Sequence, residues 1–231
     1  MFDAAILCGG KASRLGELTA SLPKSLIDIN GKPFIYHQLK LLEKSGFTHV
    51  VLCVGHLGEM ITDYVKTIDV DMKIDFSDEG DVVLGTGGAI KKALPLLNSR
   101  FFVIYGDSYL PVKYVKIEGA FTKSKKLSLM TIYRNKNKKH GNNILLENNT
   151  IVAYDKAKML PEMHHIDFGI GCFHKIVFQR MKGFVFGLDD VYKEMIKHRQ
   201  LANFEVDNQF YEIGSLEGIE EFRQYIKDKN K

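Results

Sequence analysis

The sequence predicts an α/β fold in which a mostly parallel sheet is covered by helices on both faces. Two observations carry this prediction: short apolar runs alternate with segments of helical apolar spacing, and several of those runs end at glycine or aspartate. In such a doubly wound sheet, ligands bind beyond the carboxyl ends of the strands. The chain has 231 residues, which is enough for one sheet with a smaller lobe.

The first half of the chain supplies the alternating elements. Apolar or alternating runs predict strands at residues 4–8, 49–54, 72–77 and 101–105. Apolar residues that recur every three or four positions predict helices at residues 34–45, 57–67 and 87–97. Gly9 follows the first strand and Gly106 follows the last, so we expect both glycines at the same edge of the sheet.

The second half has a different character and predicts a small β-rich lobe on the same sheet. Strands are expected at residues 127–133, 143–146, 151–154 and 166–174, and helices at residues 189–198 and 215–227. No linker composition separates the two halves. We therefore expect a single domain that spans residues 1–231, with its halves meeting near residue 110.

Composition and charge narrow the class of protein. Apolar residues make up 45% of the chain and charged residues 26%, as in soluble globular proteins. No apolar stretch approaches the roughly 20 residues that cross a bilayer, and the first residues lack a signal-peptide pattern. We expect a cytoplasmic protein without membrane insertion. The three cysteines form no CxxC pair, so reduced thiols are expected.

The net charge is +4, and much of the excess lies between residues 113 and 139. This segment is either a solvated helix end and loop or a surface for phosphorylated small molecules or nucleic acid. The aromatic and basic pattern of an RNA-binding module is missing. We therefore expect no nucleic-acid partner.

A glycine turn and two cations follow the first predicted strand. Residues 9–13 form a short loop whose backbone N–H groups can approach a phosphate. Arg14 would add a bidentate fork and Lys24 a point charge. GxGxxG and GxxxxGK[ST] are both absent, which excludes the dinucleotide fingerprint and the Walker loop. Taken alone, the segment is equally compatible with an ordinary turn and two solvated cations.

Residues 9–15, GGKASRL, followed by Pro23-Lys24, resemble the signature of sugar-1-phosphate nucleotidyltransferases, G-G-x-G-[ST]-R-[LM] and then P-K. Ala12 departs from this pattern because the family has glycine there. The resemblance implies a Rossmann-like, GT-A-like nucleotidyltransferase fold. It also implies that Arg14 and Lys24 are catalytic. The residues implied to bind the nucleotide in this loop are Leu7, Gly9, Gly10 and Ser13.

Three further motifs extend the resemblance along the chain. Residues 84–90, LGTGGAI, are similar to the family's L-G-T-[AG]-G-A-[IL], which implies that Gly85 and Gly88 bind the nucleotide. Asp107, in a Gly-Asp motif, and Glu212, in a late Glu-Ile-Gly-Ser motif, are implied to bind Mg²⁺. Two carboxylates together with phosphate oxygens suit this ion.

The acceptor side shows a weaker match. Asp155-Lys156 lies where the family has E-K-P, although Ala157 replaces the proline. The resemblance implies that Lys156 binds the acceptor phosphate. The segment around residue 143 and residues 166–171 fall where the family contacts sugar hydroxyls. The full set of implied acceptor-binding residues is Asn143, Lys156, Asp167 and Gly169.

The resemblance implies transfer of a nucleotide from an NTP to a sugar 1-phosphate, with pyrophosphate released. Residues 1–110 would form the nucleotide-binding half and residues 111–231 the acceptor-binding half. A phosphate monoester has its second pKa near ~6, so the acceptor is its own nucleophile and no general base is expected. The closest subfamilies are guanylyltransferases that act on heptose or mannose 1-phosphate. Small members are often homodimers.

Three alternatives stay open at the level of sequence. A cytidylyltransferase or another nucleotidyltransferase acting on a different sugar phosphate or phosphorylated alcohol would share the same motifs. A metal-dependent glycosyltransferase would carry D-x-D, where this chain has Gly-Asp-Ser at residues 106–108. A non-catalytic nucleotide-binding module would keep affinity without turnover. The sequence alone does not identify the nucleobase, the acceptor or the oligomeric state.

Overall fold

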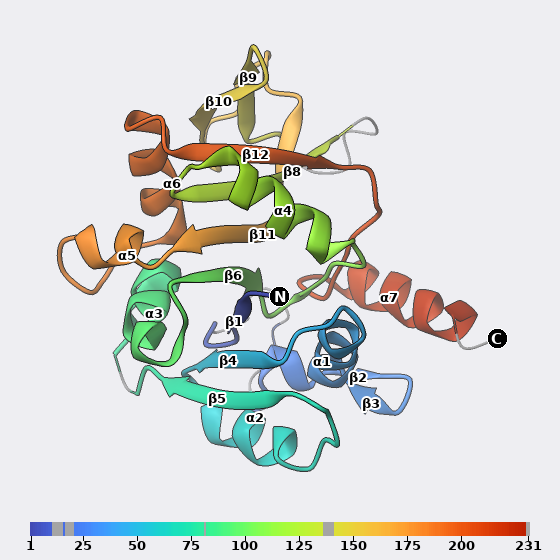
Figure 1. Ribbon diagram of the computed structural model, residues 1–231. Helices are drawn as coiled ribbons and strands as arrows, with labels where there is room; N and C mark the ends of the chain where they lie inside the picture. Colours follow the sequence, from blue (N-terminus) through green and yellow to red (C-terminus); the bar gives the residue numbers. More distant parts are fainter. Residues whose placement is uncertain (11–15, 17–20, 81, 136–140, 230–231) are drawn as a thin grey trace.

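The computed structural model describes residues 1–10, 16, 21–80, 82–135 and 141–229. Its main feature is a nine-stranded mixed sheet with helices on both faces (Figure 1). Its strands are β1 (Asp3–Leu7), β4 (His49–Val54), β5 (Lys73–Asp78), β6 (Arg100–Tyr105), β8 (Ser128–Arg134), β9 (Ile144–Glu147), β10 (Thr150–Tyr154), β11 (His165–His174) and β12 (Leu201–Val206). The predicted α/β class with a mostly parallel sheet is confirmed.

The order of the strands places four parallel strands with a shared carboxyl edge in one half of the sheet. β5, β4, β1 and β6 are neighbours and run parallel. β11 lies antiparallel beside β6, followed by β8 and then β12, and the β9–β10 hairpin joins β11 at His165. Leu7 and Tyr105 are paired at the ends of β1 and β6, so the loops that follow them emerge side by side.

Two layers of helices complete the core. One face packs on α1 (Phe34–Lys44), α2 (Gly58–Val65) and α4 (Tyr114–Ser124), and the other on α3 (Gly85–Ala93), α5 (Ile176–Arg180) and α6 (Leu188–Lys197). A separate apolar cluster joins α7 (Leu216–Lys229) to Phe34, Tyr109 and Ile213. No helix among the described residues is long and apolar enough to cross a membrane.

Short elements position the loops at the carboxyl edge. They are the 3-10 turns η2 (Lys24–Leu26) and η3 (Leu94–Leu96), the pair β2 (Asp28–Ile29) and β3 (Lys32–Pro33), and the pair β7 (Ser108–Tyr109) and β13 (Tyr211–Glu212). In the β7–β13 pair Ser108 lies opposite Glu212, and the Ile213 N–H donates to the Asp107 carbonyl at 3.0 Å. Two segments far apart in the sequence thus become neighbours.

Besides the short elements η2, β2, β3, β7, α5 and β13, which were not predicted, the elements differ from the sequence prediction in three places. α4 and β12 were not predicted: α4 lies in the charge-rich segment, although Tyr114, Ile117 and Phe121 are buried at helical spacing. The helix predicted at residues 87–97 begins at Gly85, and its α-helical part ends at Ala93. Pro95 lacks the N–H that an α-helix needs, and the last turn is 3-10.

Candidate active site

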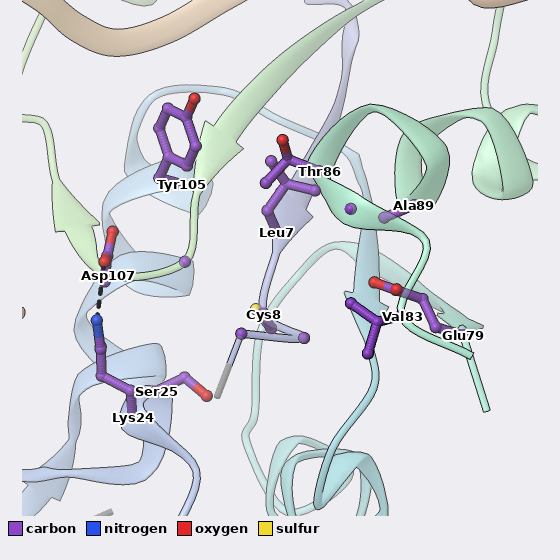
Figure 2. Close-up of a pocket in the computed structure, with 14 residues that line it drawn as sticks. Leu7, Cys8, Lys24, Ser25, Glu79, Val83, Thr86, Ala89, Tyr105 and Asp107 are labelled. Atoms are coloured by element: carbon purple, nitrogen blue, oxygen red, sulfur yellow. Dashed lines mark hydrogen bonds and ion pairs between the residues drawn. The ribbon is translucent and has the colours of Figure 1, made fainter. Parts of the chain in front are cut away.

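A cavity of about 260 Å³ opens at the carboxyl edge of the parallel strands. Its walls come from the ends of β1 and β6, from η2, from the turn after β5 and from the start of α3 (Figure 2). Because these are neighbouring parallel strands, their carboxyl ends and the helix that follows converge on one place. Of the residues predicted to bind nucleotide, Leu7, Gly9, Gly10 and Gly85 line this cavity.

An ion pair occupies one side of the cavity. The Lys24 ammonium donates to Asp107 Oδ2 at 3.1 Å, and the Ser108 hydroxyl donates to Asp107 Oδ1 at 3.2 Å. Lys24 begins the η2 turn and Asp107 follows β6, so tertiary structure alone brings them together. The predicted catalytic cation and the predicted metal ligand therefore neutralise each other's charge.

Glu79 lies on the opposite side of the cavity from Lys24 and Asp107 (Figure 2). It is half-buried, and its Oε2 accepts a hydrogen bond from the Leu84 N–H at 3.1 Å. Burial raises the pKa of this carboxyl, and Asp78 adds to the rise, while the Leu84 N–H and Lys92 oppose it. Sequence reasoning missed Glu79. The available signal was its place directly after β5, at the same edge as Gly9 and Asp107.

The Ser25 hydroxyl is a second group that sequence reasoning missed. Ser25 follows Lys24 in η2, is 2% exposed and lines the cavity. Within the part of the chain that the structure describes, its Oγ has no hydrogen-bond partner. A buried hydroxyl without a partner is costly, and such groups in native proteins call for an explanation. A ligand that accepts a hydrogen bond from the cavity wall would provide one.

The glycine turn after β1 has a specific steric role. A Cβ at Gly9 would lie 2.9 Å from Glu79 Oε1 and 3.4 Å from the Gly55 nitrogen, so glycine lets the carboxylate approach the loop backbone. Among the described residues, no atom lies within 4 Å of a Cβ placed at Gly10. Two predicted site residues, Ser13 and Arg14, lie outside the described residues, as does Ala12.

The glycines at the start of α3 divide into two roles. Gly85 lines the cavity and has a φ of +75°, a conformation that favours glycine. Gly88 is buried and is not part of the cavity wall; the N–H groups of Gly87 and Gly88 both donate to the Phe186 carbonyl, at 3.0 and 3.2 Å. A Cβ at Gly88 would clash with the Phe184 carbonyl oxygen. Close packing of the segment before α6 therefore accounts for this glycine.

Glu212 lies beside Asp107 through the β7–β13 pairing but faces its own turn. Its Oε2 accepts from the Gly214 N–H and its Oε1 from the Ser215 hydroxyl. In the described part of the chain, no group of three or more His, Cys, Asp or Glu side chains is placed to hold a metal ion.

The chemistry of Asp107 nevertheless fits a divalent cation, because its Oδ2 already accepts the Lys24 ammonium. Within the described residues each Glu212 oxygen accepts one hydrogen bond, so each keeps a lone pair that could face the same cation. A site with one or two carboxylates and substrate phosphates is the kind that Mg²⁺ uses.

The predicted acceptor residues also come together. The Asp167 N–H donates to Asn143 Oδ1 at 3.0 Å, and Asp167 Oδ1 accepts from the Gly169 N–H at 2.9 Å. The Tyr154 hydroxyl donates to Asp167 Oδ2 at 3.0 Å. Burial raises the pKa of Asp167, while Lys156, the Gly169 N–H and the Tyr154 hydroxyl oppose the rise. This group of side chains surrounds a backbone turn at Gly169, whose φ is +96°.

Lys156 joins the acceptor group to the cavity. Its ammonium donates to the Tyr105 hydroxyl at 3.4 Å, and Tyr105 lines the cavity. The site thus has three parts arranged in space. Glu79 lies at one end of the cavity, the Lys24–Asp107 pair lies at the other, and the predicted acceptor residues lie beyond Tyr105. Such an arrangement suits a reaction between two bound substrates.

Comparison with known proteins assigns this fold and site to a family. The family model described as "Nucleotidyl transferase" matches residues 3–151, more than half of the chain. The chain belongs to the nucleotidyl transferase family. The family prediction made from the glycine loop and the Pro23-Lys24 motif is confirmed.

Two relatives and one solved structure match this chain over nearly its whole length. The chain is 28% identical over 221 residues to the D-glycero-alpha-D-manno-heptose 1-phosphate guanylyltransferase of Campylobacter jejuni, covering 95% of this chain and 98% of that one. It is 28% identical over 216 residues to the protein of the same name from Aneurinibacillus thermoaerophilus, covering 92% and 93%. HddC from Yersinia pseudotuberculosis, solved with GMP-PN, superposes with a TM-score of 0.82 at 25% identity, covering 98% and 100%.

Proposed function

We propose that this chain transfers GMP from GTP to a sugar 1-phosphate, with heptose or mannose 1-phosphate favoured, and releases pyrophosphate. The observation that carries the choice of base is the Glu79 carboxylate at the end of the cavity away from Lys24. The guanylyltransferase names of the Campylobacter and Aneurinibacillus relatives support the same substrates. The product would be a nucleotide sugar for cell-surface glycan synthesis, made in the cytoplasm.

Glu79 selects guanine because an ionised carboxylate only accepts hydrogen bonds. Guanine offers two adjacent donors, N1–H and the 2-amino group, which can meet both oxygens of one carboxylate. Adenine and cytosine each present one amino donor beside an acceptor nitrogen, and uracil presents one N–H between two carbonyls. A paired, charge-assisted contact in a half-buried site is strong and geometrically specific. Guanine therefore matches this wall best.

The phosphates would extend from the base toward Lys24. The unpartnered Ser25 hydroxyl would donate to a phosphate oxygen, and the Lys24 ammonium would turn from Asp107 to the leaving pyrophosphate. An oxygen of the acceptor phosphate attacks the α-phosphorus, and the bond from that phosphorus to the bridging oxygen of pyrophosphate breaks. Because the acceptor is a dianion at neutral pH, the residues stabilise charge and align the reactants instead of moving a proton.

Asp107 and Glu212 are the residues that would hold a divalent ion. Mg²⁺ bound there would neutralise phosphate charge at the reacting centre. Arg14 and Ser13, which lie outside the described residues, are proposed to act on the triphosphate with Gly9 and Gly10. Lys156 would hold the acceptor phosphate, while Asn143, Asp167 and Gly169 would contact the sugar. Residues 1–110 are thus proposed as the nucleotide half and residues 111–231 as the acceptor half of a single domain.

A substrate panel tests this function. Each of the four NTPs is combined with mannose, heptose or glucose 1-phosphate, and pyrophosphate release is measured with Mg²⁺ present. We expect GTP with heptose or mannose 1-phosphate to give the highest kcat/KM. Higher turnover with CTP, or with a phosphorylated alcohol added to the panel, would replace the guanylyl assignment with the cytidylyl alternative. Binding of GTP without turnover on any acceptor would favour a non-catalytic module.

A further inference from the structure

Lys156, an exposed lysine of the acceptor group, is held by two aromatic rings and a hydroxyl. Its ammonium lies 5.3 Å from the centre of the Tyr105 ring and 5.7 Å from the centre of the Tyr154 ring. It also donates to the Tyr105 hydroxyl at 3.4 Å. A long, exposed lysine normally samples many rotamers, and two aromatic rings with one oxygen restrict that freedom.

Tyr105 is itself fixed at a point shared by the two substrates. It is the last residue of β6, and the buried Gln38 donates from Nε2 to its carbonyl at 2.9 Å. Its ring lines the nucleotide cavity, and the backbone turn at Gly169 lies against its other side, where a Cβ would be 3.5 Å from Tyr105 Cδ2. Tyr105 therefore cannot shift without disturbing both the cavity and the acceptor group.

Lys24 and Lys156 have partners of different chemistry, and this difference matters for phosphate binding. Lys24 is paired with a carboxylate, which cancels its charge. Tyr105 and Tyr154 are neutral: burial raises the pKa of both hydroxyls, and nearby carboxylates such as Asp167 add to the rise. A neutral partner orients an ammonium without cancelling its charge. Tyr105 and Tyr154 thus orient the Lys156 ammonium without forming an ion pair with it. Asp167 is the carboxylate close enough to interact with the charge of that ammonium.

We infer that Tyr105 is the positioning residue that aims Lys156 at the acceptor phosphate. This inference rests on the proposed function, because it concerns the acceptor of that same reaction. Tyr105 acts through Lys156, so loss of its hydroxyl should weaken binding of the acceptor and leave binding of the nucleotide nearly unaffected. A residue that only packed at the end of β6 would instead change stability, or weaken both substrates together.

Two variants separate the ring from the hydroxyl. Tyr105→Phe keeps the ring and loses the oxygen that accepts from Lys156, and Tyr105→Leu loses both contacts. We expect the Kd for mannose 1-phosphate, measured by calorimetry, to rise roughly threefold in Tyr105→Phe and roughly tenfold in Tyr105→Leu. The Kd for GTP should stay within about twofold in Tyr105→Phe, which keeps the ring that lines the cavity, and should rise less than the Kd for mannose 1-phosphate in Tyr105→Leu. Tyr36→Leu is the matched control, since Lys32 lies 5.4 Å from the Tyr36 ring outside the site.

A double-mutant cycle tests the route through the ammonium. Lys156→Met should raise the Kd for mannose 1-phosphate by itself, and adding Tyr105→Leu should then change it by less than about twofold. Full additivity of the two changes, or an equal loss of GTP affinity, overturns the positioning role. Binding is measured apart from turnover, so wild-type protein that binds mannose 1-phosphate but releases no pyrophosphate contradicts the proposed function alone. Failure of wild type to bind any sugar phosphate overturns both.

Discussion

The Lys24 ammonium lies 3.1 Å from the Asp107 carboxylate, on the side of the cavity opposite Glu79. One of these residues is the cation proposed to stabilise the leaving pyrophosphate, and the other is the carboxylate proposed to hold a divalent ion. Each partly neutralises the charge of the other, and both line the cavity. A divalent ion held by Asp107 would weaken this ion pair, and the Lys24 ammonium would then be freer to contact phosphate oxygens.

Replacing Lys24 with methionine should abolish most of the activity without unfolding the protein. We expect kcat/KM to fall roughly 10²-fold or more, as when a charge-stabilising donor is removed from an active site. Asp107 has a side chain that is 36% exposed, so water can solvate it after the change. Pyrophosphate release and thermal melting are the measurements. Lys66→Met, which removes an exposed lysine paired with Asp63, is the matched control and should leave turnover unchanged.

Replacing Ser25 with alanine should move stability and binding in opposite directions. The hydroxyl is buried and has no partner among the described residues, so its removal should leave the free energy of unfolding unchanged or raise it. The same change should raise the Kd for GTP roughly tenfold, because a donor to the phosphates is lost. Chemical denaturation and calorimetry measure the two effects. A less stable variant with normal GTP affinity would show that the hydroxyl serves the fold.

Replacing Glu79 with glutamine should relax the choice of base. Inosine triphosphate lacks the 2-amino group, so wild type should prefer GTP over ITP by roughly tenfold or more in kcat/KM. In Glu79→Gln the amide oxygen can accept from only one of the two guanine donors, and this preference should shrink. Glu59→Gln, a change in a neighbouring exposed carboxylate, is the control. Equal GTP to ITP ratios in wild type and Glu79→Gln would remove Glu79 from base recognition.

The raised pKa of Glu79 predicts a pH dependence of GTP binding. The group must be ionised to accept both guanine donors, and burial raises its pKa above the ordinary 4.5. As the pH falls through this raised pKa the carboxyl takes up a proton, so GTP affinity should fall with it. The affinity is measured from neutral pH down to 4.5 in wild type and Glu79→Gln. Titration of the GTP phosphates affects both proteins equally, so the difference between the two curves isolates Glu79.

Two glycine substitutions test why the start of α3 is glycine-rich. Gly88→Ala should lower the free energy of unfolding by about 1–3 kcal/mol, because the new Cβ meets the Phe184 carbonyl. Gly119→Ala is the matched control: Gly119 lies within α4, and no atom of the described part of the chain lies within 4 Å of its Cβ position. Alanine there should raise the free energy of unfolding by up to about 1 kcal/mol. Denaturant melts compare both variants with wild type.

Local patterns in the sequence were enough to predict most of the sheet and its helices. The buried strands β1, β4 and β6 are apolar runs that stop at glycine, and these signals survive in the structure with shifts of one or two residues. β12 was missed because it is an edge strand whose apolar and polar residues do not alternate cleanly. α4 was missed because its three buried residues, Tyr114, Ile117 and Phe121, are separated by charged residues and a glycine, which makes its apolar periodicity weak.

The site was predictable only where a motif marks it. Lys24 and Asp107 were named from their motifs, but their ion pair depends on how η2 packs beside the end of β6. Glu79 carries no motif, and its place against Gly9 follows from the register of β5 beside β4. The packing of Gly88 against Phe186 depends on a segment about a hundred residues later in the chain, which no local pattern can reveal.

The Phe186 carbonyl that receives the N–H groups of Gly87 and Gly88 has a consequence for protein engineering. The segment before α6 therefore packs against and supports α3, the helix that begins at the cavity. A chimaera that joins residues 1–110 of this chain to the second part of a relative would exchange that supporting segment as well as the acceptor contacts. Recombination intended to change the specificity for the sugar would then also disturb recognition of the base, unless residues 181–188 of this chain are kept together with residues 1–110.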